Sequence, residues 1–190
     1  MKRRYELKER ARRQAETRQR IVDAAVALHT SVGPARTTIS AIAEQAGVER
    51  HTVYAHFPDE RTLFQACSGH WRAQHPLPDP DAFIGIPDPD QRLRSALEAM
   101  YEWYESVEGD LALFVRDASL VAVVADTQGE TAGRIADLAD RLARGWPRRK
   151  AVRAAIGHGL EFETWRSLVR RHGLTRRQAV NSMLDFVQAV

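Results

Sequence analysis

The chain has 190 residues, with 28 basic and 25 acidic side chains and a formal net charge of +3. Hydrophobic residues make up 44% and charged residues 28%, a globular composition that excludes wholesale disorder. No uncharged apolar run approaches the roughly 18 residues of a transmembrane helix. No apolar run follows the basic N-terminus, so we expect no secretory signal. The single cysteine, Cys67, excludes an internal disulfide and is compatible with the cytoplasm, where we expect the protein.

The charge is unevenly distributed along the chain. Residues 1–74 hold 13 basic and 8 acidic side chains, whereas residues 75–190 hold 15 and 17. The first twenty residues alone hold nine basic and three acidic groups. A basic first third indicates contact with a polyanion. A solvated basic helix face would give the same charge balance, so charge alone leaves both interpretations open.

Proline and glycine divide the chain, and between these breaks the apolar residues recur with a helical period. In the first segment an apolar stripe with i, i+3, i+4, i+7 spacing is formed by Ile21, Ala24, Ala25 and Leu28. Residues 75–90 contain five prolines and four aspartates, and we predict a linker there. The predicted domains are therefore 1–74 and 91–190. The whole chain is predicted to be all-α, with about nine helices.

Residues 37–57, TTISAIAEQAGVERHTVYAHF, predict two short helices joined by a tight turn. Thr37 or Thr38 caps a first helix that ends before Gly47. Gly47 supplies the permissive backbone that the turn needs. A second helix follows at about residues 49–56. This arrangement describes a helix-turn-helix.

The second helix of this motif presents hydrogen-bond donors. With Val53 and Phe57 predicted to face the core, the outward side chains are Arg50, His51, Thr52, Tyr54 and His56. Such a helix fits the major groove of DNA, where an arginine donates two hydrogen bonds to guanine. We predict that Arg50 reads a base and that the next two residues contact bases or phosphates. The tyrosine and the second histidine are placed to hold the phosphate backbone.

The stretch from Ile21 to Phe64 resembles the DNA-binding domain of the TetR family of bacterial transcriptional regulators. The matching segments are IVDAAVALHTSVG, TTISAIAEQAGV and ERHTVYAHFPDERTLF, with the Val-Tyr-x-His-Phe core at residues 53–57 as the most specific part. The resemblance implies a homodimeric, ligand-responsive regulator, most often a repressor, that binds a palindromic operator in double-stranded DNA. It also implies a larger C-terminal helical domain for dimerisation and ligand binding.

One position departs from the family pattern. The family usually places a lysine near the start of the fourth helix, but here Glu60 follows Asp59. These acids suit a helix N-terminus but repel phosphate, so we assign the contact to the neighbouring Arg61. The predicted DNA-binding residues are Thr38, Arg50, His51, Thr52, Tyr54, His56 and Arg61.

The N-terminal extension, residues 2–20, is longer than the first helix of the domain needs. An arm with this charge would lie along the DNA backbone or reach a minor groove. The alternative is a solvated tail that contacts nothing.

The last two helices are predicted at about 147–172 and 175–189, with Pro147 and Thr175 at their N-termini. The first carries small residues that permit close helix packing, at Ala151, Ala154, Ala155, Gly157 and Gly159. The second carries an apolar stripe formed by Val180, Met183, Leu184 and Val187. We predict that these helices form the homodimer interface. The stripes could instead face only their own subunit.

Aromatic residues gather in the second part of the chain, and aromatic side chains commonly line small-molecule pockets. Core packing is the commoner use of such residues. For an unidentified small-molecule effector, the predicted lining is Trp71, Tyr101, Tyr104, Phe114, Phe162 and Trp165.

The main alternative is a small helical enzyme or a metal-binding protein. We find no nucleophile elbow, phosphate-binding loop or dinucleotide-binding turn. Cys67 and His70 have metal-ligand spacing on one helix, and His75 could fold back towards them, but isolated pairs of this kind are usually incidental. We therefore expect no catalytic residues, no metal and no cofactor. A third alternative, an adaptor that binds no nucleic acid, is disfavoured by the polar cluster at residues 50–56.

Overall fold

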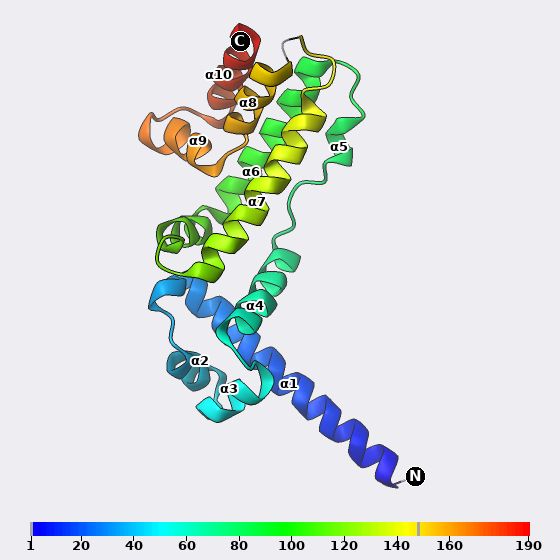
Figure 1. The fold of residues 1–190 in the computed structure, drawn as a ribbon, viewed down its shortest axis with the longest axis vertical. Coiled ribbons are helices and arrows are strands. Elements are labelled where there is room, and N and C mark those ends of the chain that lie inside the picture. Colours follow the sequence, from blue (N-terminus) through cyan, green and yellow to red (C-terminus); the bar gives the residue numbers. More distant parts are fainter. Residues whose placement is uncertain (1, 148) are drawn as a thin grey trace. The chain divides into compact units, whose positions relative to one another are not determined.

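The structure is a computed structural model that describes residues 2–147 and 149–190 (Figure 1). Every regular element in these ranges is helical, which confirms the all-α prediction. No helix in the described ranges is long and apolar enough to cross a bilayer. The chain forms two compact units. One comprises the chain up to Pro76 together with Gly109–Asp126, and the other comprises Leu77–Glu108 and Thr127–Val190.

The first unit contains the N-terminal helices. Its elements are α1 (Lys2–Ser31), the 3₁₀ turn η1 (Pro34–Arg36), α2 (Ile39–Ala46), α3 (Arg50–His56), α4 (Glu60–Gln74), the end of α6 (Pro89–Asp117) and the start of α7 (Ala122–Leu142). The predicted stripe on α1 is buried at Ile21, Ala24 and Ala25 and half-buried at Leu28. Residues 5–20 of the same helix bury no side chain completely. The core of this unit therefore begins at Ile21.

The second unit contains the remaining helices. Its elements are α5 (Asp81–Ile84), most of α6 and α7, α8 (Arg149–Gly159), α9 (Phe162–Arg166), the π-helical turn η2 (Ser167–Arg171) and α10 (Arg176–Ala189). The proline-rich stretch 75–90 includes α5, whose Phe83 is buried. Because α6 and α7 each contribute residues to both units, the compact units differ from the contiguous domains predicted at 1–74 and 91–190.

The predicted single helix at 147–172 is wrong, because the chain leaves the helix between Gly159 and Phe162. The Tyr101 hydroxyl donates to the Gly159 carbonyl at 2.8 Å, and the Tyr104 hydroxyl donates to the Leu160 carbonyl at 2.6 Å. Buried carbonyl groups need a partner. The two tyrosines on α6 supply one where the helical hydrogen bonds stop.

The final helix forms as predicted, from Arg176 to Ala189. Thr175 is its N-cap and forms a reciprocal capping box with Gln178. Its apolar stripe is buried within the chain itself, at Val180, Met183, Leu184 and Val187. The assignment of this stripe to a subunit interface is therefore wrong. Helical periodicity shows that a face is covered, but it does not show by what.

The three candidate metal ligands do not converge. The buried Cys67 Sγ lies 3.4 Å from His29 Nδ1. His70 Nε2 lies 3.3 Å from an Asp23 carboxylate oxygen. His75 stacks on Trp71. The described residues contain no group of three or more His, Cys, Asp or Glu side chains that could hold a metal ion.

Burial keeps both members of the His29–Cys67 contact uncharged. It lowers the pKa of His29 to about 4 and raises the pKa of Cys67 to about 12. Folding therefore places a neutral imidazole in the core of the first unit. The same histidine in the unfolded chain has a pKa of about 6.5.

This difference predicts an acid-sensitive core. Because the folded-state pKa of His29 is the lower one, the unfolded chain takes up the proton first as pH falls. The contribution of the neutral His29 to the free energy of unfolding is complete above about pH 6.5. It falls by about 3 kcal/mol as the pH is lowered towards 4. Urea unfolding of wild type and His29→Leu at pH 7 and pH 4 measures it. An unchanged pH dependence in the variant would contradict this assignment.

Candidate nucleic-acid interface

The first helix of the helix-turn-helix is fixed at its N-terminus by Thr38. Its Oγ1 accepts a hydrogen bond from the Ala41 N–H at 3.1 Å, so the N-cap is Thr38 and not Thr37. The Thr37 hydroxyl instead donates to the Gly33 carbonyl at 2.9 Å. The Thr38 side chain is exposed and keeps its own O–H free to donate. A cap and a phosphate contact are therefore compatible at this residue.

The turn between α2 and α3 has a left-handed residue at its centre. Gly47 has φ 65° and ψ 42°. Its N–H donates to the Glu44 carbonyl at 3.1 Å, and the Val48 N–H donates to the Ala43 carbonyl at 3.0 Å. This pair of bonds is a Schellman motif, which closes the helix and reverses the chain. The direction in which α3 leaves the turn is thereby set by backbone geometry.

The inward face of α3 anchors it in the core. Val53 and the following Phe57 are completely buried, as predicted. The guanidinium carbon of Arg18, on α1, lies 4.6 Å from the centre of the Phe57 ring, which is a cation–π distance. Helix α3 is thus held by the burial of Val53 and Phe57 and, at its C-terminal end, by the contact between Arg18 of α1 and Phe57.

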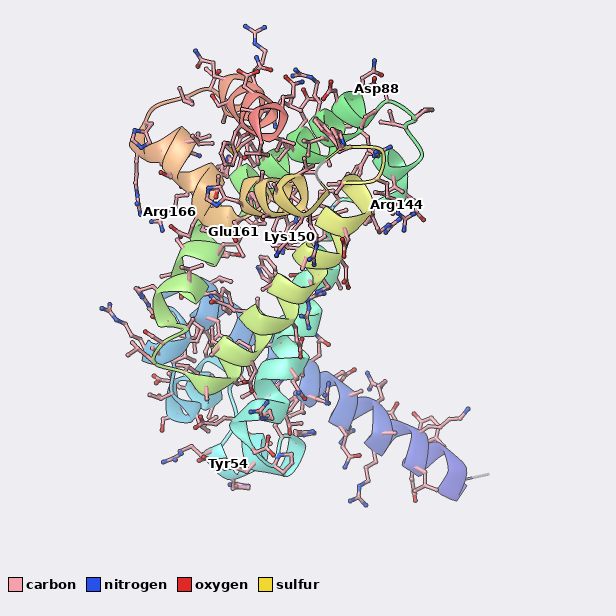
Figure 2. All side chains as sticks on the ribbon, turned by 45° about the horizontal axis from the view of Figure 1, so that its top comes forward. Tyr54, Asp88, Arg144, Lys150, Glu161 and Arg166 are labelled. Carbon is pink, nitrogen blue, oxygen red and sulfur yellow. The ribbon has the colours of Figure 1, made fainter. Side chains whose placement is uncertain are left out.

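The outward face of α3 presents the predicted donors. Arg50, His51 and Tyr54 are exposed, and Thr52 and His56 are half-buried. Figure 2 shows the Tyr54 side chain extending away from the helix, and 44% of its surface is accessible. The five polar side chains therefore lie on the part of α3 that faces away from Val53, together with the exposed Ala55.

At the start of α4, the Arg61 side chain already has an acidic partner, which does not fit its predicted role as a phosphate contact. The Arg61 guanidinium forms a salt bridge of 2.8 Å with Asp126. A phosphate at Arg61 would therefore compete with that carboxylate. Asp59 caps the helix by accepting from both the hydroxyl and the N–H of Thr62 at 2.6 Å, and these bonds lower its pKa.

A carboxylate missed by the sequence analysis holds the loop before α2. Asp117, buried at the end of α6, accepts the Ala35 N–H at 2.9 Å and the Arg116 Nε–H at 2.6 Å. Both hydrogen bonds lower the pKa of the Asp117 carboxyl, and the bond from Arg116 has the larger effect. Arg116 also donates to the Val32 carbonyl at 2.8 Å. These bonds fix the connection through which α1 positions the helix-turn-helix.

The predicted effector-binding residues separate into two clusters. In the second unit, Tyr104 lies 5.4 Å from Phe162 and 5.8 Å from Trp165 between ring centres, and Tyr101 lies beside Tyr104. Within the described residues, the buried Trp165 indole N–H has no acceptor. The other two predicted residues belong to the first unit.

Those two residues are Trp71 and Phe114, whose ring centres lie 6.4 Å apart. Trp71 Nε1 donates to an Asp110 carboxylate oxygen at 2.6 Å. Phe114 also contacts Phe64 edge-on. Both side chains thus have packing partners within the first unit.

The fold and this surface define an all-α protein with a helix-turn-helix domain. Residues 21–67 match the family model described as "Bacterial regulatory proteins, tetR family". Residues 21–67 are therefore similar to the DNA-binding domain of TetR-family regulators, as the sequence motifs of this segment predict.

One curated relative is similar in the first part of the chain, and solved structures share the fold. The HTH-type transcriptional regulator SrpR of Pseudomonas putida is 44% identical over 62 residues, which cover 33% of this chain and 28% of SrpR. The match therefore leaves most of both proteins unaligned. A TetR-like transcriptional regulator from Rhodococcus sp. RHA1 aligns with a TM-score of 0.63 at 21% identity, covering 90% of this chain and 93% of the other. A SmeT–triclosan complex has a TM-score of 0.63 at 20% identity, covering 91% and 90%. At these identities the two structures show a shared fold.

The turn geometry predicts opposite effects of alanine at two glycines. Gly47→Ala should lower the free energy of unfolding by about 1–2 kcal/mol, because a Cβ disfavours the left-handed backbone. The space itself is open, since the nearest heavy atom to an added Cβ is Arg20 Nη1 at 3.7 Å. Gly69 lies within α4, and a Cβ added there has no heavy atom within 4 Å. Gly69→Ala should therefore raise the free energy of unfolding by about 0.5–1 kcal/mol. Urea unfolding of both variants measures the pair, and a neutral Gly47→Ala would contradict the role of the turn.

Proposed function

We propose that the protein is a sequence-specific DNA-binding transcriptional regulator that places α3 in the major groove. The observation that carries this proposal is the polar outer face of a short helix whose inner face is locked by Val53 and Phe57. The groove is about 12 Å wide and admits one helix. The family assignment of residues 21–67 supports the same function.

The two ends of α3 have different tasks in this proposal. Arg50 is the first residue of the helix, and the N-terminal residues of a recognition helix contact base edges. Its side chain is exposed and forms the fork that matches the two acceptors of guanine. Tyr54 and His56 lie one turn or more further on and contact phosphates. Base reading and backbone clamping are thereby separated along one helix.

This separation predicts distinct effects of two substitutions. Arg50→Ala should weaken binding to a duplex selected from random DNA by about 1–3 kcal/mol, with a much smaller loss on unselected DNA. Tyr54→Phe removes one hydroxyl and should weaken both kinds of DNA similarly. Titrations of both variants on both duplexes at one salt concentration measure this. Equal losses for Arg50→Ala on the two duplexes would refute its base-reading role.

We also propose a homodimer formed by α8 and α10, through the faces that their own chain leaves uncovered. Phe186 on α10 is 43% exposed, and its ring lies 6.4 Å from that of His158 on α8. Small side chains flank this pair on the outer face of α8, where Ala151 and Ala154 are exposed. Figure 1 shows these two helices adjacent. A two-fold dimer would bind a palindromic operator with half-sites roughly 34–36 Å apart or a multiple of that.

The exposed phenylalanine provides the test of this interface. Phe186→Glu should weaken the dimer by about 2–4 kcal/mol, because an aromatic anchor is replaced by a charge that the interface must bury. Leu120→Glu is the matched control, because Leu120 is 72% exposed and belongs to the other unit. Sedimentation velocity at micromolar concentration compares both variants with wild type. A monomeric wild type refutes the dimer, and an unaffected Phe186→Glu dimer refutes the assigned face.

The regulator is further proposed to respond to a small-molecule effector, most simply as a repressor that the effector releases from DNA. Support comes from the second unit, where Tyr104, Phe162 and Trp165 form an aromatic cluster. The Trp165 indole N–H needs an acceptor. An apolar or aromatic effector with one hydrogen-bond acceptor would satisfy it. The effector acts only to the extent that it binds the two DNA-binding states with different affinity.

A further inference from the structure

The N-terminal half of α1 carries a polar row on the side of the recognition helix. Arg10, Arg13, Thr17 and Arg20 recur at i, i+3, i+7 and i+10, so they share one helix face. Arg20 lies beside the turn, near Gly47. The row therefore starts at the helix-turn-helix and continues along α1 towards its N-terminus.

This face of α1 and the outer part of α3 line one groove. Its lining is Tyr5, Glu6, Glu9, Arg10, Arg13, Gln14 and Thr17 from α1 with Thr52 and His56 from α3. A second hollow follows on α1, lined by Arg13, Glu16, Thr17, Gln19 and Arg20. The wall of the groove is thus shared by the extension and by two residues of the proposed DNA surface.

The arginines of the extension differ in how far acids neutralise them. Arg12 donates to Glu9 at 3.0 Å and to Glu16 at 2.7 Å, so its charge is internally paired. Arg10 forms no hydrogen bond or ion pair with any described residue. Arg13 lies 4.0 Å from Glu9 and keeps 78% of its side chain exposed. Two cations of the groove are therefore available to an anion, whereas Arg12 is occupied.

We propose that one DNA strand lies in this groove. Arg10 and Arg13 contact its phosphates next to those that His56 contacts. The proposal rests on the proposed function, because Thr52 and His56 place the groove against DNA. From Arg10 to Arg20 the helix rises about 15 Å. The row is therefore long enough to contact more than one phosphate of a strand.

The acids in the groove fit this assignment. Glu9 is occupied by Arg12, and that bond lowers its pKa. Glu6 is the remaining carboxylate in the lining and opposes an anion there. Glu6→Gln should therefore strengthen DNA binding, the opposite sign to loss of an arginine. Side chains at positions 6, 10 and 13 are all exposed, so these substitutions leave the core intact.

The decisive experiment compares salt dependence on an unselected 30-base-pair duplex. Each phosphate contact contributes about 0.9 to the slope of log affinity against log salt. The double variant Arg10→Gln/Arg13→Gln should reduce that slope by about 1.8, so that a rise from 50 to 200 mM salt costs about tenfold less affinity than in wild type. Lys8→Gln, which removes one positive charge from an exposed residue outside the groove lining, should leave the slope unchanged.

Three outcomes overturn the proposal. Equal slopes for the double variant and wild type make the extension a solvated tail. An equal reduction of the slope per removed charge in Lys8→Gln shows that the charges of the extension act through a diffuse field, without a strand bound in the groove. Loss of preference for a selected duplex in the double variant shows that the extension reads bases. In each case a sequence-selective effect of Arg50→Ala still stands, so failure here is distinct from failure of the proposed function.

Discussion

The burial of Val53 and Phe57 is the interaction on which the recognition surface depends. Helix α3 has seven residues, and helices shorter than about 12–15 residues are marginal alone in water. Its helical state and its direction therefore come from packing. Since these two side chains point into the core, the five polar residues between and around them must point outward. The chemistry offered to DNA follows from two apolar contacts.

A second constraint sets where that helix lies relative to α1. The turn at Gly47 fixes the angle between α2 and α3, and Asp117 fixes the connection between α1 and α2 through the Ala35 N–H. The hydrogen bonds from Arg116 and Ala35 lower the pKa of the Asp117 carboxyl although burial alone would raise it, so these bonds keep the buried carboxylate charged. The end of α6 thus belongs to the first unit, although more than thirty residues separate it from the N-terminal segment of that unit in the sequence.

The sequence predicted correctly those features that depend only on residues close together in the chain. The stripe on α1, the N-cap of α2 and the turn at Gly47 each depend on residues within a few positions of one another. The sequence indicated all three, but it left the cap open between Thr37 and Thr38. The break after Gly159 depends on tyrosine hydroxyls 56 and 58 residues away. No periodicity signals such a bond. The covering of the α10 stripe likewise depends on distant elements, so its direction was assigned wrongly.

The ion pairs of Arg12 and the continuity of α1 explain why the extension is a helix before any partner binds. Acids at 9 and 16 bracket Arg12 at helical spacing, and such pairs each stabilise an exposed helix by a few tenths of a kcal/mol. Helix α1 is continuous with a core segment that begins at Ile21, so the extension needs no separate nucleation. An ordered arm loses less conformational entropy on binding than a coil does. The acids that weaken the net positive charge of the arm therefore also preorganise its remaining cations. Their cost in attraction to phosphate falls mainly on Arg12, since Glu9 lies farther from Arg13, at 4.0 Å.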